Sequence, residues 1–384
     1  MKATLGNFLK PIKRGVEVSG DGTYRQVGVR VWGKGSYERG TITGKETQYK
    51  TLFEVKSGDL IINKIWSRNG AIAIVPQEQN GCFVSTEFPT FEIDTKKVDP
   101  IWLNIRLATQ DFWHKCALAS GGTSGKNRIK VEKFLDINID LPNLSEQHKR
   151  IEKYKLQAIS HSELVNKVNS NISSLEKMVK TFFYSRIKNC NYDKMINIAP
   201  IIRRSVNITA LETYPELGIR SFGKGTFHKP SIEGKELGSK KLFEIRENDL
   251  LFSNVFAWEG AIAVANSSDT GRFGSHRFIS CLCKENLADP YFLRYYFLSP
   301  EGMEAIRKAS PGSAGRNKTL GLKKLEAILV PCPSIDEQKK FRQIYLDSLL
   351  LISKLQKSLT DSELIRKTYI QKVILASASN SFKS

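Results

Sequence analysis

Two short segments combine glycine with cationic and amide side chains, a pattern that suits contact with a polyanion. They are Gly125-Lys126-Asn127-Arg128 and Gly315-Arg316-Asn317-Lys318. Lys and Arg bind phosphate oxygens, and Arg, Lys and Asn can also donate hydrogen bonds to base edges. We therefore interpret the Lys, Arg and Asn positions of both segments as candidate nucleic-acid contacts. A structural turn whose cations are merely solvated explains the same residues equally well.

The charge of the whole chain agrees with a polyanionic partner. The 384 residues include 59 Lys and Arg against 39 Asp and Glu, a formal net charge of +20. The excess is spread along the chain, with 30 basic and 19 acidic residues in positions 1–190 and 29 and 20 in positions 191–384. Nucleic acid is the first candidate partner for such a surface. A generally basic protein without that partner is the alternative.

Composition and cysteine spacing argue against several other classes. Hydrophobic residues make up 40% and charged residues 26%, as in globular proteins. The six cysteines form no CxxC pair, and no histidine stands at zinc-finger spacing from them. The longest aliphatic run, at positions 349–352, is too short to span a bilayer, and the N-terminus lacks the apolar core of a signal peptide. We expect a soluble cytoplasmic protein with no disulfide, no structural zinc and no cofactor.

The residues that could take part in enzyme chemistry are explained more simply as structural residues. Asp289-Pro290 is followed by Tyr and Phe, but its counterpart Asp99-Pro100 is followed by Ile and Trp, so both predict helix starts. Glu54-Val55-Lys56 could end a metal-dependent nuclease motif, but an exposed strand end explains it better. No Ser/His/Asp or Cys/His arrangement can be argued, and the loop ending at Lys126 continues with Asn instead of Ser or Thr. We therefore expect a protein that is not an enzyme.

The chain repeats itself at a shift of 190 residues. The matched pairs of segments are 28–37 and 218–227, 44–46 and 234–236, 52–55 and 242–245, 70–73 and 260–263, and 125–128 and 315–318. One inserted residue then moves the shift to 191, and Pro142…Glu146-Gln147 lies over Pro333…Glu337-Gln338. The chain is therefore two copies of one unit in tandem.

The first part of each copy, 1–142 and 191–333, predicts a mixed α+β globule. Short apolar runs at 60–62 and 71–75 read as buried strands separated by a glycine-containing turn, and the runs at 250–252 and 261–264 repeat them. After the two Asp-Pro helix starts, we expect one helix over 102–113 and one over 291–306. The fold class is thus α+β, with two α/β globules.

The second part of each copy, 143–190 and 334–384, predicts one long helix. Asn143…Glu146 and Ser334…Glu337 resemble capping boxes. Apolar residues then follow heptads, interrupted by His161 in the first helix and by Ser348, Ser362 and Arg366 in the second. We expect the two helices to pack antiparallel as a coiled-coil spacer of about 60 Å, which places the globules at its ends with pseudo-twofold symmetry.

With this arrangement of elements, the sequence resembles the specificity subunit of Type I restriction-modification systems. The resemblance rests on the duplicated segments 121–129 and 310–318, the duplicated Pro-x-x-x-Glu-Gln signature, and the order globule, helix, globule, helix. It implies that 1–142 and 191–333 are target-recognition domains, each reading one half of a bipartite site in double-stranded DNA. It also implies that the helices bind two copies of a methyltransferase subunit, that a restriction subunit can join, and that the chain itself does no chemistry.

Two globules that read different half-sites must do so with residues that differ between the copies. Trp66-Ser67-Arg68-Asn69 matches Phe256-Ala257-Trp258-Glu259, and Glu87 matches Arg277. We name Trp66, Arg68, Asn69, Trp258 and Arg277 as candidates for base contact, with an ordinary variable hairpin as the alternative. Lys34 and Lys224 lie between paired glycines that both copies keep; they are DNA-contact candidates, although a structural turn is slightly favoured there.

A stand-alone DNA-binding or architectural protein with two modules and no methyltransferase partner is the alternative function. Such a protein would be a well-behaved monomer that binds DNA tightly by itself. A subunit would instead expose unfilled apolar surface on its helices and aggregate when expressed alone.

Overall fold

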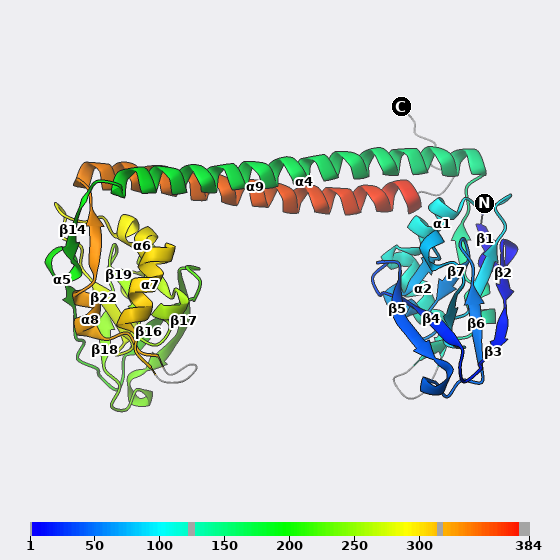
Figure 1. The fold of residues 1–384 in the computed structure, drawn as a ribbon, viewed down its shortest axis with the longest axis horizontal. Coiled ribbons are helices and arrows are strands. Elements are labelled where there is room, and N and C mark those ends of the chain that lie inside the picture. Colours follow the sequence, from blue (N-terminus) through cyan, green and yellow to red (C-terminus); the bar gives the residue numbers. More distant parts are fainter. Residues whose placement is uncertain (1, 122–126, 313–317, 376–384) are drawn as a thin grey trace. The chain divides into compact units, whose positions relative to one another are not determined.

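The computed structural model describes residues 2–121, 127–312 and 318–375, which form two compact units. Unit 1 consists of residues 1–167 with 358–384, and unit 2 of residues 168–357. Two long helices, α4 (Leu144–Ile187) and α9 (Ile335–Leu375), each contribute to both units (Figure 1). The long helices expected from the heptads are therefore present.

The globule of unit 1 contains two main sheets. The first has the order β2 (Leu9–Ile12), β10 (Thr90–Ile93), β7 (Leu60–Ile62) and β8 (Ile72–Ile74). The second has the order β3 (Gly15–Glu17), β6 (Thr51–Val55), β9 (Cys82–Val84), β4 (Thr23–Val29) and β5 (Ser36–Thr43). Two-stranded pairs join β1 (Lys2–Thr4) to β13 (Asn138–Asp140) and β11 (Ser120–Gly121) to β12 (Arg128–Ile129). The helices are α1 (Pro100–Leu107), α2 (Gln110–Ala119) and α3 (Val131–Leu135).

The globule of unit 2 repeats this topology. One sheet has the order β15 (Ile201–Ile202), β22 (Phe278–Cys281), β19 (Leu250–Ser253) and β20 (Ile262–Val264). The other has the order β17 (Thr226–Glu233), β16 (Thr213–Ile219), β21 (Phe273–Ser275) and β18 (Leu242–Glu244). β14 (Asn191–Lys194) pairs with β23 (Leu329–Cys332), and the helices are α5 (Met195–Ile198), α6 (Pro290–Leu298), α7 (Pro300–Ala309) and α8 (Leu322–Glu326). The internal repeat seen in the sequence is thus a repeat of structure.

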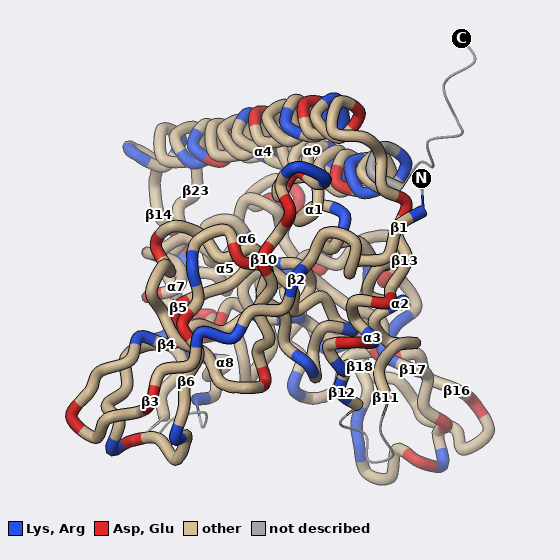
Figure 2. Tube along the Cα trace, turned by 90° about the vertical axis from the view of Figure 1, so that its right-hand side faces the viewer, with Lys and Arg blue, Asp and Glu red and all other residues tan. Residues whose placement is uncertain are grey.

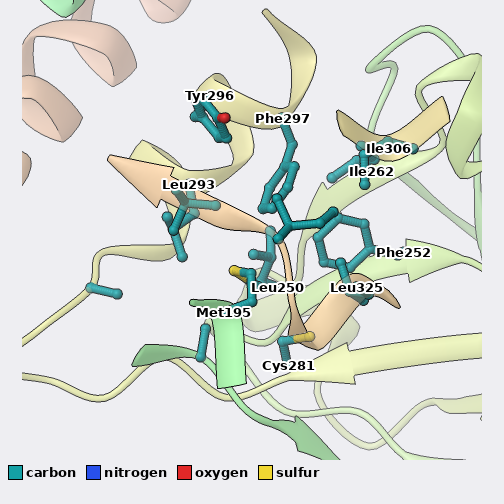
Figure 3. Packing of buried hydrophobic residues seen from close by; sticks show 14 of the residues in the cluster. Met195, Leu250, Phe252, Ile262, Cys281, Leu293, Tyr296, Phe297, Ile306 and Leu325 are labelled. Atoms are coloured by element: carbon teal, nitrogen blue, oxygen red, sulfur yellow. The ribbon is translucent and has the colours of Figure 1, made fainter. Parts of the chain in front are cut away.

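The predicted buried strands lie in the cores. Strands β7 and β8 are antiparallel and pair Leu60 with Ile74, and strands β19 and β20 are antiparallel and pair Leu250 with Val264. These four side chains are buried or half-buried. Figure 3 shows how helices and strands share the core of unit 2: Phe252 and Ile262 from the sheet meet Phe297 and Ile306 from α6 and α7. Helices therefore cover one face of the sheet that bears β19.

Each predicted short helix is in fact two helices. Asp99 and Asp289 cap α1 and α6 by accepting backbone hydrogen bonds, as expected. In each globule this helix then ends and a second helix begins. Thr109 caps α2, and Ser299 caps α7, which has Pro300 in its first turn. The expectation of single helices over 102–113 and 291–306 was wrong, since hydrophobic periodicity continues across a break that only these caps mark.

The long helices pack against each other antiparallel within each unit. In unit 2, Phe182 of α4 stacks on Phe341 of α9, and Arg186 is 3.4 Å from Glu337. In unit 1, His161 is 3.1 Å from the hydroxyl of Ser362 and 3.2 Å from the carboxylate of Glu363. The polar residues that interrupt the two heptad patterns thus face each other, which satisfies hydrogen-bonding groups that would otherwise be buried among apolar residues.

Candidate nucleic-acid interface

The turn between β4 and β5 presents the first predicted lysine to solvent. Arg30 N donates a hydrogen bond to Gly35 O at 2.9 Å and closes the turn, and Arg220 N does the same with Gly225 O in unit 2. Gly33, Gly35, Gly223 and Gly225 all have positive φ between 65° and 78°. This conformation favours glycine, so the paired glycines are structural, as expected, and Lys34 and Lys224 are exposed between them. We call residues 30–35 and 220–225 the tips.

The segment that we named as the main candidate for base contact, 66–69 and 256–259, docks onto each tip. In unit 1, Trp32 N and Gly33 N donate to the carbonyls of Asn69 and Gly70 at 2.6 and 3.1 Å. In unit 2, Phe222 N and Gly223 N donate to Glu259 and Gly260 at 2.9 and 2.8 Å. The predicted open loops are short 3₁₀ helices, Ser67–Asn69 and Ala257–Glu259. Backbone hydrogen bonds therefore bring the predicted lysine and the predicted base-reading segment together in both units.

A third segment, the end of the duplicated Gly-rich loop, joins this cluster. Ile129 N donates to Lys64 O at 3.0 Å, and Leu320 N donates to Asn254 O at 2.8 Å. Lys64 N and Asn254 N in turn donate to the carbonyls of Glu87 and Arg277. The candidate residues therefore gather from four stretches of chain that are far apart in sequence: the tip, the 3₁₀ segment, the position of Glu87 or Arg277, and the end of the Gly-rich loop. We call this set of four segments the loop cluster of each unit.

Side-chain contacts within the loop clusters differ between the units. In unit 1, Arg128 forms an ion pair with Glu87, with 3.0 Å between Nε and Oε2. In unit 2, Lys318 Nζ lies 5.1 Å from the centroid of the Trp258 ring, a cation–π contact. Arg277 of unit 2 corresponds to Glu87 of unit 1. Unit 2 therefore has a second cation, beside Lys318, where unit 1 has an acidic group. The two clusters thus share a backbone and differ in charge.

The remaining predicted site residues have these positions. Trp66 is 49% exposed, Arg277 is exposed, and Arg68, Asn69, Asn127 and Trp258 are half-buried. The indole of Trp258 donates to Val255 O at 2.8 Å, which fixes the ring beneath Lys318. Lys126, Arg316 and Asn317 lie outside the described residues.

Sequence reasoning missed two aromatic residues at the tips. Trp32 is 56% exposed and Phe222 is 75% exposed, and both have positive φ, 64° and 61°. The repeat alignment contained the available signal, since both copies place an aromatic residue directly before Gly-Lys-Gly.

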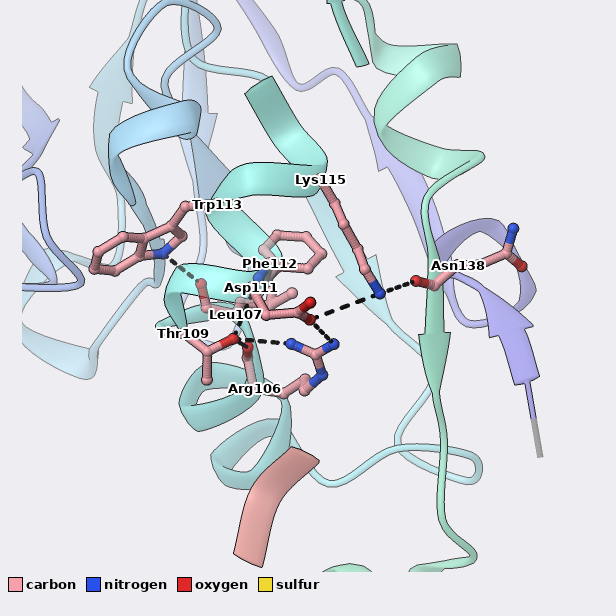
Figure 4. A network of polar contacts seen from close by, with 8 residues as sticks. All are labelled: Arg106, Leu107, Thr109, Asp111, Phe112, Trp113, Lys115 and Asn138. Carbon is pink, nitrogen blue, oxygen red and sulfur yellow. Dashed lines mark hydrogen bonds and ion pairs between the residues drawn. The ribbon is translucent and has the colours of Figure 1, made fainter. Parts of the chain in front are cut away.

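A polar network holds the helices behind the tip of unit 1 (Figure 4). Arg106, only 3% exposed, donates to Thr109 Oγ1 at 2.9 Å and to Asp111 Oδ2 at 2.7 Å. Trp113 donates to Leu107 O at 2.9 Å, and its ring packs against Trp32 with 5.8 Å between centroids. Burial alone would raise the pKa of Asp111, but the hydrogen bond and charge of Arg106 and the charge of Lys115 together lower it. The carboxylate is therefore the stable form in this network.

The cysteines are not poised as nucleophiles. Burial raises the pKa of Cys116 and of Cys283 to about 12, so both remain neutral thiols at neutral pH. Within residues 2–121, 127–312 and 318–375, no group of three His, Cys, Asp or Glu side chains could hold a metal ion. In the same ranges, no helix has the length and apolar character needed to cross a membrane.

Basic residues are distributed over both units. Figure 2 shows Lys and Arg interspersed with Asp and Glu along α4 and α9 and around the sheets, with no basic tail among the coloured residues. The tips carry exposed arginines next to the lysines: Arg30 lies over the Tyr37 ring at 4.5 Å and Arg220 over Phe227 at 4.9 Å. Positive charge at the loop clusters therefore comes from both shared and differing positions.

Comparison with known proteins agrees with this arrangement. Residues 5–174 match the family described as "Type I restriction modification DNA specificity domain". The structure resembles the HsdS subunit from Thermoanaerobacter tengcongensis, with a TM-score of 0.64, 14% identity, and 98% and 97% of the two chains covered. It also resembles a chain from a structure of the type I R-M system titled for its complex assembly and conformational transition, with a TM-score of 0.69, 16% identity and 98% of each chain covered. Comparison with curated proteins gives no match. Residues 5–174 of the 384 are therefore similar to the Type I restriction-modification DNA specificity domain family, and the chain as a whole has the fold of the HsdS subunits.

Proposed function

We propose that this chain is the DNA specificity subunit of a Type I restriction-modification complex in which each unit reads one half of a bipartite site. One observation carries the proposal: both units assemble the same four segments into a loop cluster, while the side chains that differ between the copies lie inside it. Arg68 corresponds to Trp258 and Glu87 to Arg277. To bind two different half-sites, the two units need different base-contacting side chains, and a common backbone arrangement can hold both sets.

The chemistry of the loop clusters supports separate roles for shared and differing residues. Lys34 and Lys224 are exposed on identical turns, so they suit phosphates, which are the same at every sequence. Arg68 and Asn69 in unit 1 can donate to purine edges, whereas Glu259 in unit 2 can accept from the amino group of cytosine. Asn127, Arg128 and Lys318 border these readers, and we assign them to DNA contact as well. From the sequence alone, we make the same assignment for Lys126, Arg316 and Asn317, which lie outside the described residues.

The long helices suit two further roles, spacing and docking. Each unit exposes apolar side chains on α4 and α9: Leu156, Ile159, Leu364 and Ile365 in unit 1, and Met178, Leu349, Leu350 and Leu351 in unit 2. Exposed apolar residues at this density on a helix pair favour a protein partner. We assign one methyltransferase subunit to each unit, so that the chain directs methyl transfer that its partners perform. A restriction subunit can join the same complex.

The decisive experiment is a genome-wide map of methylated adenine in the host with and without this gene. Loss of one split motif, two short blocks around a fixed gap, is the expected result. No lost motif, together with purification of the chain free of any methyltransferase, would support a stand-alone DNA-binding protein instead.

An exchange of modules tests the assignment of half-sites. Replacement of residues 1–142 by the corresponding module of another specificity subunit is expected to change one block of the motif and leave the other block and the gap intact. A change in both blocks would contradict independent reading by the two units.

A further inference from the structure

The aromatic residue at each tip is held in a conformation that its side chain disfavours. Trp32 has a φ of 64° and Phe222 a φ of 61°, in the left-handed region that bulky residues seldom occupy. Glycine adopts this conformation without the clash between Cβ and backbone. Both copies nevertheless place an aromatic residue there and reserve glycine for the next position.

Burial of the ring does not account for this choice. Phe222 is 75% exposed and Trp32 56% exposed, so most of each ring faces solvent. Phe222 lies near Lys224, with 5.8 Å between Nζ and the ring centroid, and Trp32 meets Trp113 edge to face, with 5.8 Å between the ring centroids. An exposed apolar side chain on a strained backbone gains little in the free protein. Strain of this kind persists where surrounding contacts enforce it, and it concentrates at functional sites.

The surrounding contacts fix the tips firmly. In unit 2, the backbone on either side of Phe222 is held by hydrogen bonds to Glu259 and Gly260, and Arg294 donates to Gly223 O at 2.6 Å. A Cβ at Gly223 would lie 2.9 Å from Leu298 Cδ1, so the tip also packs closely on α6. The aromatic ring therefore projects from a rigid base and is oriented before any ligand arrives.

The chemistry around each ring indicates what it meets. Exposed Lys34 and Arg30 flank Trp32, and Lys224 and Arg220 flank Phe222. A second exposed aromatic residue accompanies each tip, Trp66 at 49% and Phe256 at 43%. Surfaces that bind nucleic acids combine these two kinds of side chain: cations bind the phosphate backbone, and aromatic rings stack on bases.

We propose that Trp32 and Phe222 stack on a base of the bound duplex, one in each half-site, and locally unstack it from its neighbour. This inference rests on the proposed function and adds residues and a contact to it. Because both copies keep an aromatic residue here while the neighbouring readers differ, the contact strengthens binding to both half-sites without choosing their sequence. It also explains the strain, since the left-handed backbone directs the ring away from the protein surface.

The test uses the full chain purified with its methyltransferase subunit and a duplex that carries the split motif, substituted with 2-aminopurine at successive positions. The wild-type complex is expected to increase 2-aminopurine fluorescence at one position in each half-site, as a base unstacks. Phe222→Gly should abolish the increase in one half-site only and weaken duplex binding roughly 5- to 100-fold. Trp32→Gly should do the same in the other half-site, and Trp32→Phe should retain most of the effect.

Thermal unfolding separates this role from a structural one. Phe222→Gly relieves the backbone strain and removes little packing, so its melting temperature should equal or exceed that of the wild type while its binding falls. Leu211→Ala is the control, because Leu211 is 99% exposed in the same unit and lies outside the loop cluster; its binding should not change. Equal binding by wild type and both glycine variants, or a loss of binding that tracks a loss of stability, would overturn this inference alone. A wild-type complex without sequence-selective binding would overturn the proposed function, and this inference with it.

Discussion

The side chain of Gln147 binds the backbone of Asp99, the residue that caps α1, and so attaches the start of α4 to the globule. Its Oε1 accepts from Asp99 N at 2.8 Å, and its Nε2 donates to Pro142 O at 2.8 Å and to Lys97 O at 3.2 Å. Gln147 is fully buried. The repeat copy is the same, since Gln338 accepts from Asp289 N at 2.9 Å and donates to Pro333 O and Leu287 O. The duplicated Pro-x-x-x-Glu-Gln signature is therefore a structural joint.

Gln147→Leu should destabilise unit 1 strongly. The substitution removes the partner of one half-buried backbone N–H, of the buried Pro142 carbonyl and of the Lys97 carbonyl. A buried group left without a partner costs about 1–3 kcal/mol. We expect a loss of about 2–5 kcal/mol in the free energy of unfolding, measured by chemical denaturation of the full chain. Gln343→Leu is the matched control, because Gln343 is exposed on α9 and its amide donates to Asp347 of the same helix. Equal loss in both variants would show that the joint contributes nothing specific.

The network around Asp111 should make unit 1 sensitive to acid. Interaction with Arg106 lowers the folded-state pKa of Asp111 below its unfolded value. A lowered carboxyl pKa stabilises the fold at pH values above the unfolded pKa of about 4, and this contribution disappears as pH falls through the folded pKa. Asp111→Asn should therefore lower the melting temperature at pH 7, and its deficit relative to the wild type should shrink below about pH 4.

Glu152→Gln provides the control for that titration. Glu152 pairs with Lys155 on the exposed surface of α4, where an ion pair contributes little. Its melting temperature should follow that of the wild type from pH 7 to pH 3. A deficit of Asp111→Asn that stays constant over the same range would mean that the charge of Asp111 is not what stabilises the network.

The sequence predicted more of the fold than of the site, for physical reasons. Heptads and Asp-Pro caps are local patterns, and they correctly predicted the two long helices and the starts of α1 and α6. The repeat likewise predicted two globules of the same topology. The breaks at Thr109 and Ser299 were missed because a polar cap in an apolar stretch leaves the helical period intact. At the site, residues 34, 66–69 and 128 were named separately, but their assembly depends on backbone hydrogen bonds between distant segments. The tip aromatics were missed because the alignment of the two copies shows an aromatic residue before Gly-Lys-Gly but shows neither its exposure nor its positive φ.

Exchange of the differing residues should transfer sequence preference between units. The variant Trp66→Phe, Arg68→Trp, Asn69→Glu and Glu87→Arg gives unit 1 the side chains that unit 2 has at the corresponding positions. Because the backbone of both loop clusters is the same, we expect the variant to fold and to methylate a motif in which only one block has changed. Adenine methylation mapping of a host that expresses the variant checks this result. The control carries Lys34→Gln, which removes a shared cation and should weaken methylation of the original motif without altering its bases.

A heptad inserted into both long helices should lengthen the gap of the motif and leave its two blocks unchanged. The insertions belong after Lys167 in α4 and after Lys357 in α9, where each helix passes from one unit to the other. Seven residues add about 10 Å of helix, which corresponds to about three base pairs of duplex, and a whole heptad keeps the apolar seam facing its partner. A heptad in α4 alone is the control: it shifts one helix past the other, so His161 no longer faces Ser362, and methylation should be lost. Methylation mapping gives the gap directly, and an unchanged gap in the double insertion would show that the helices do not set the spacing.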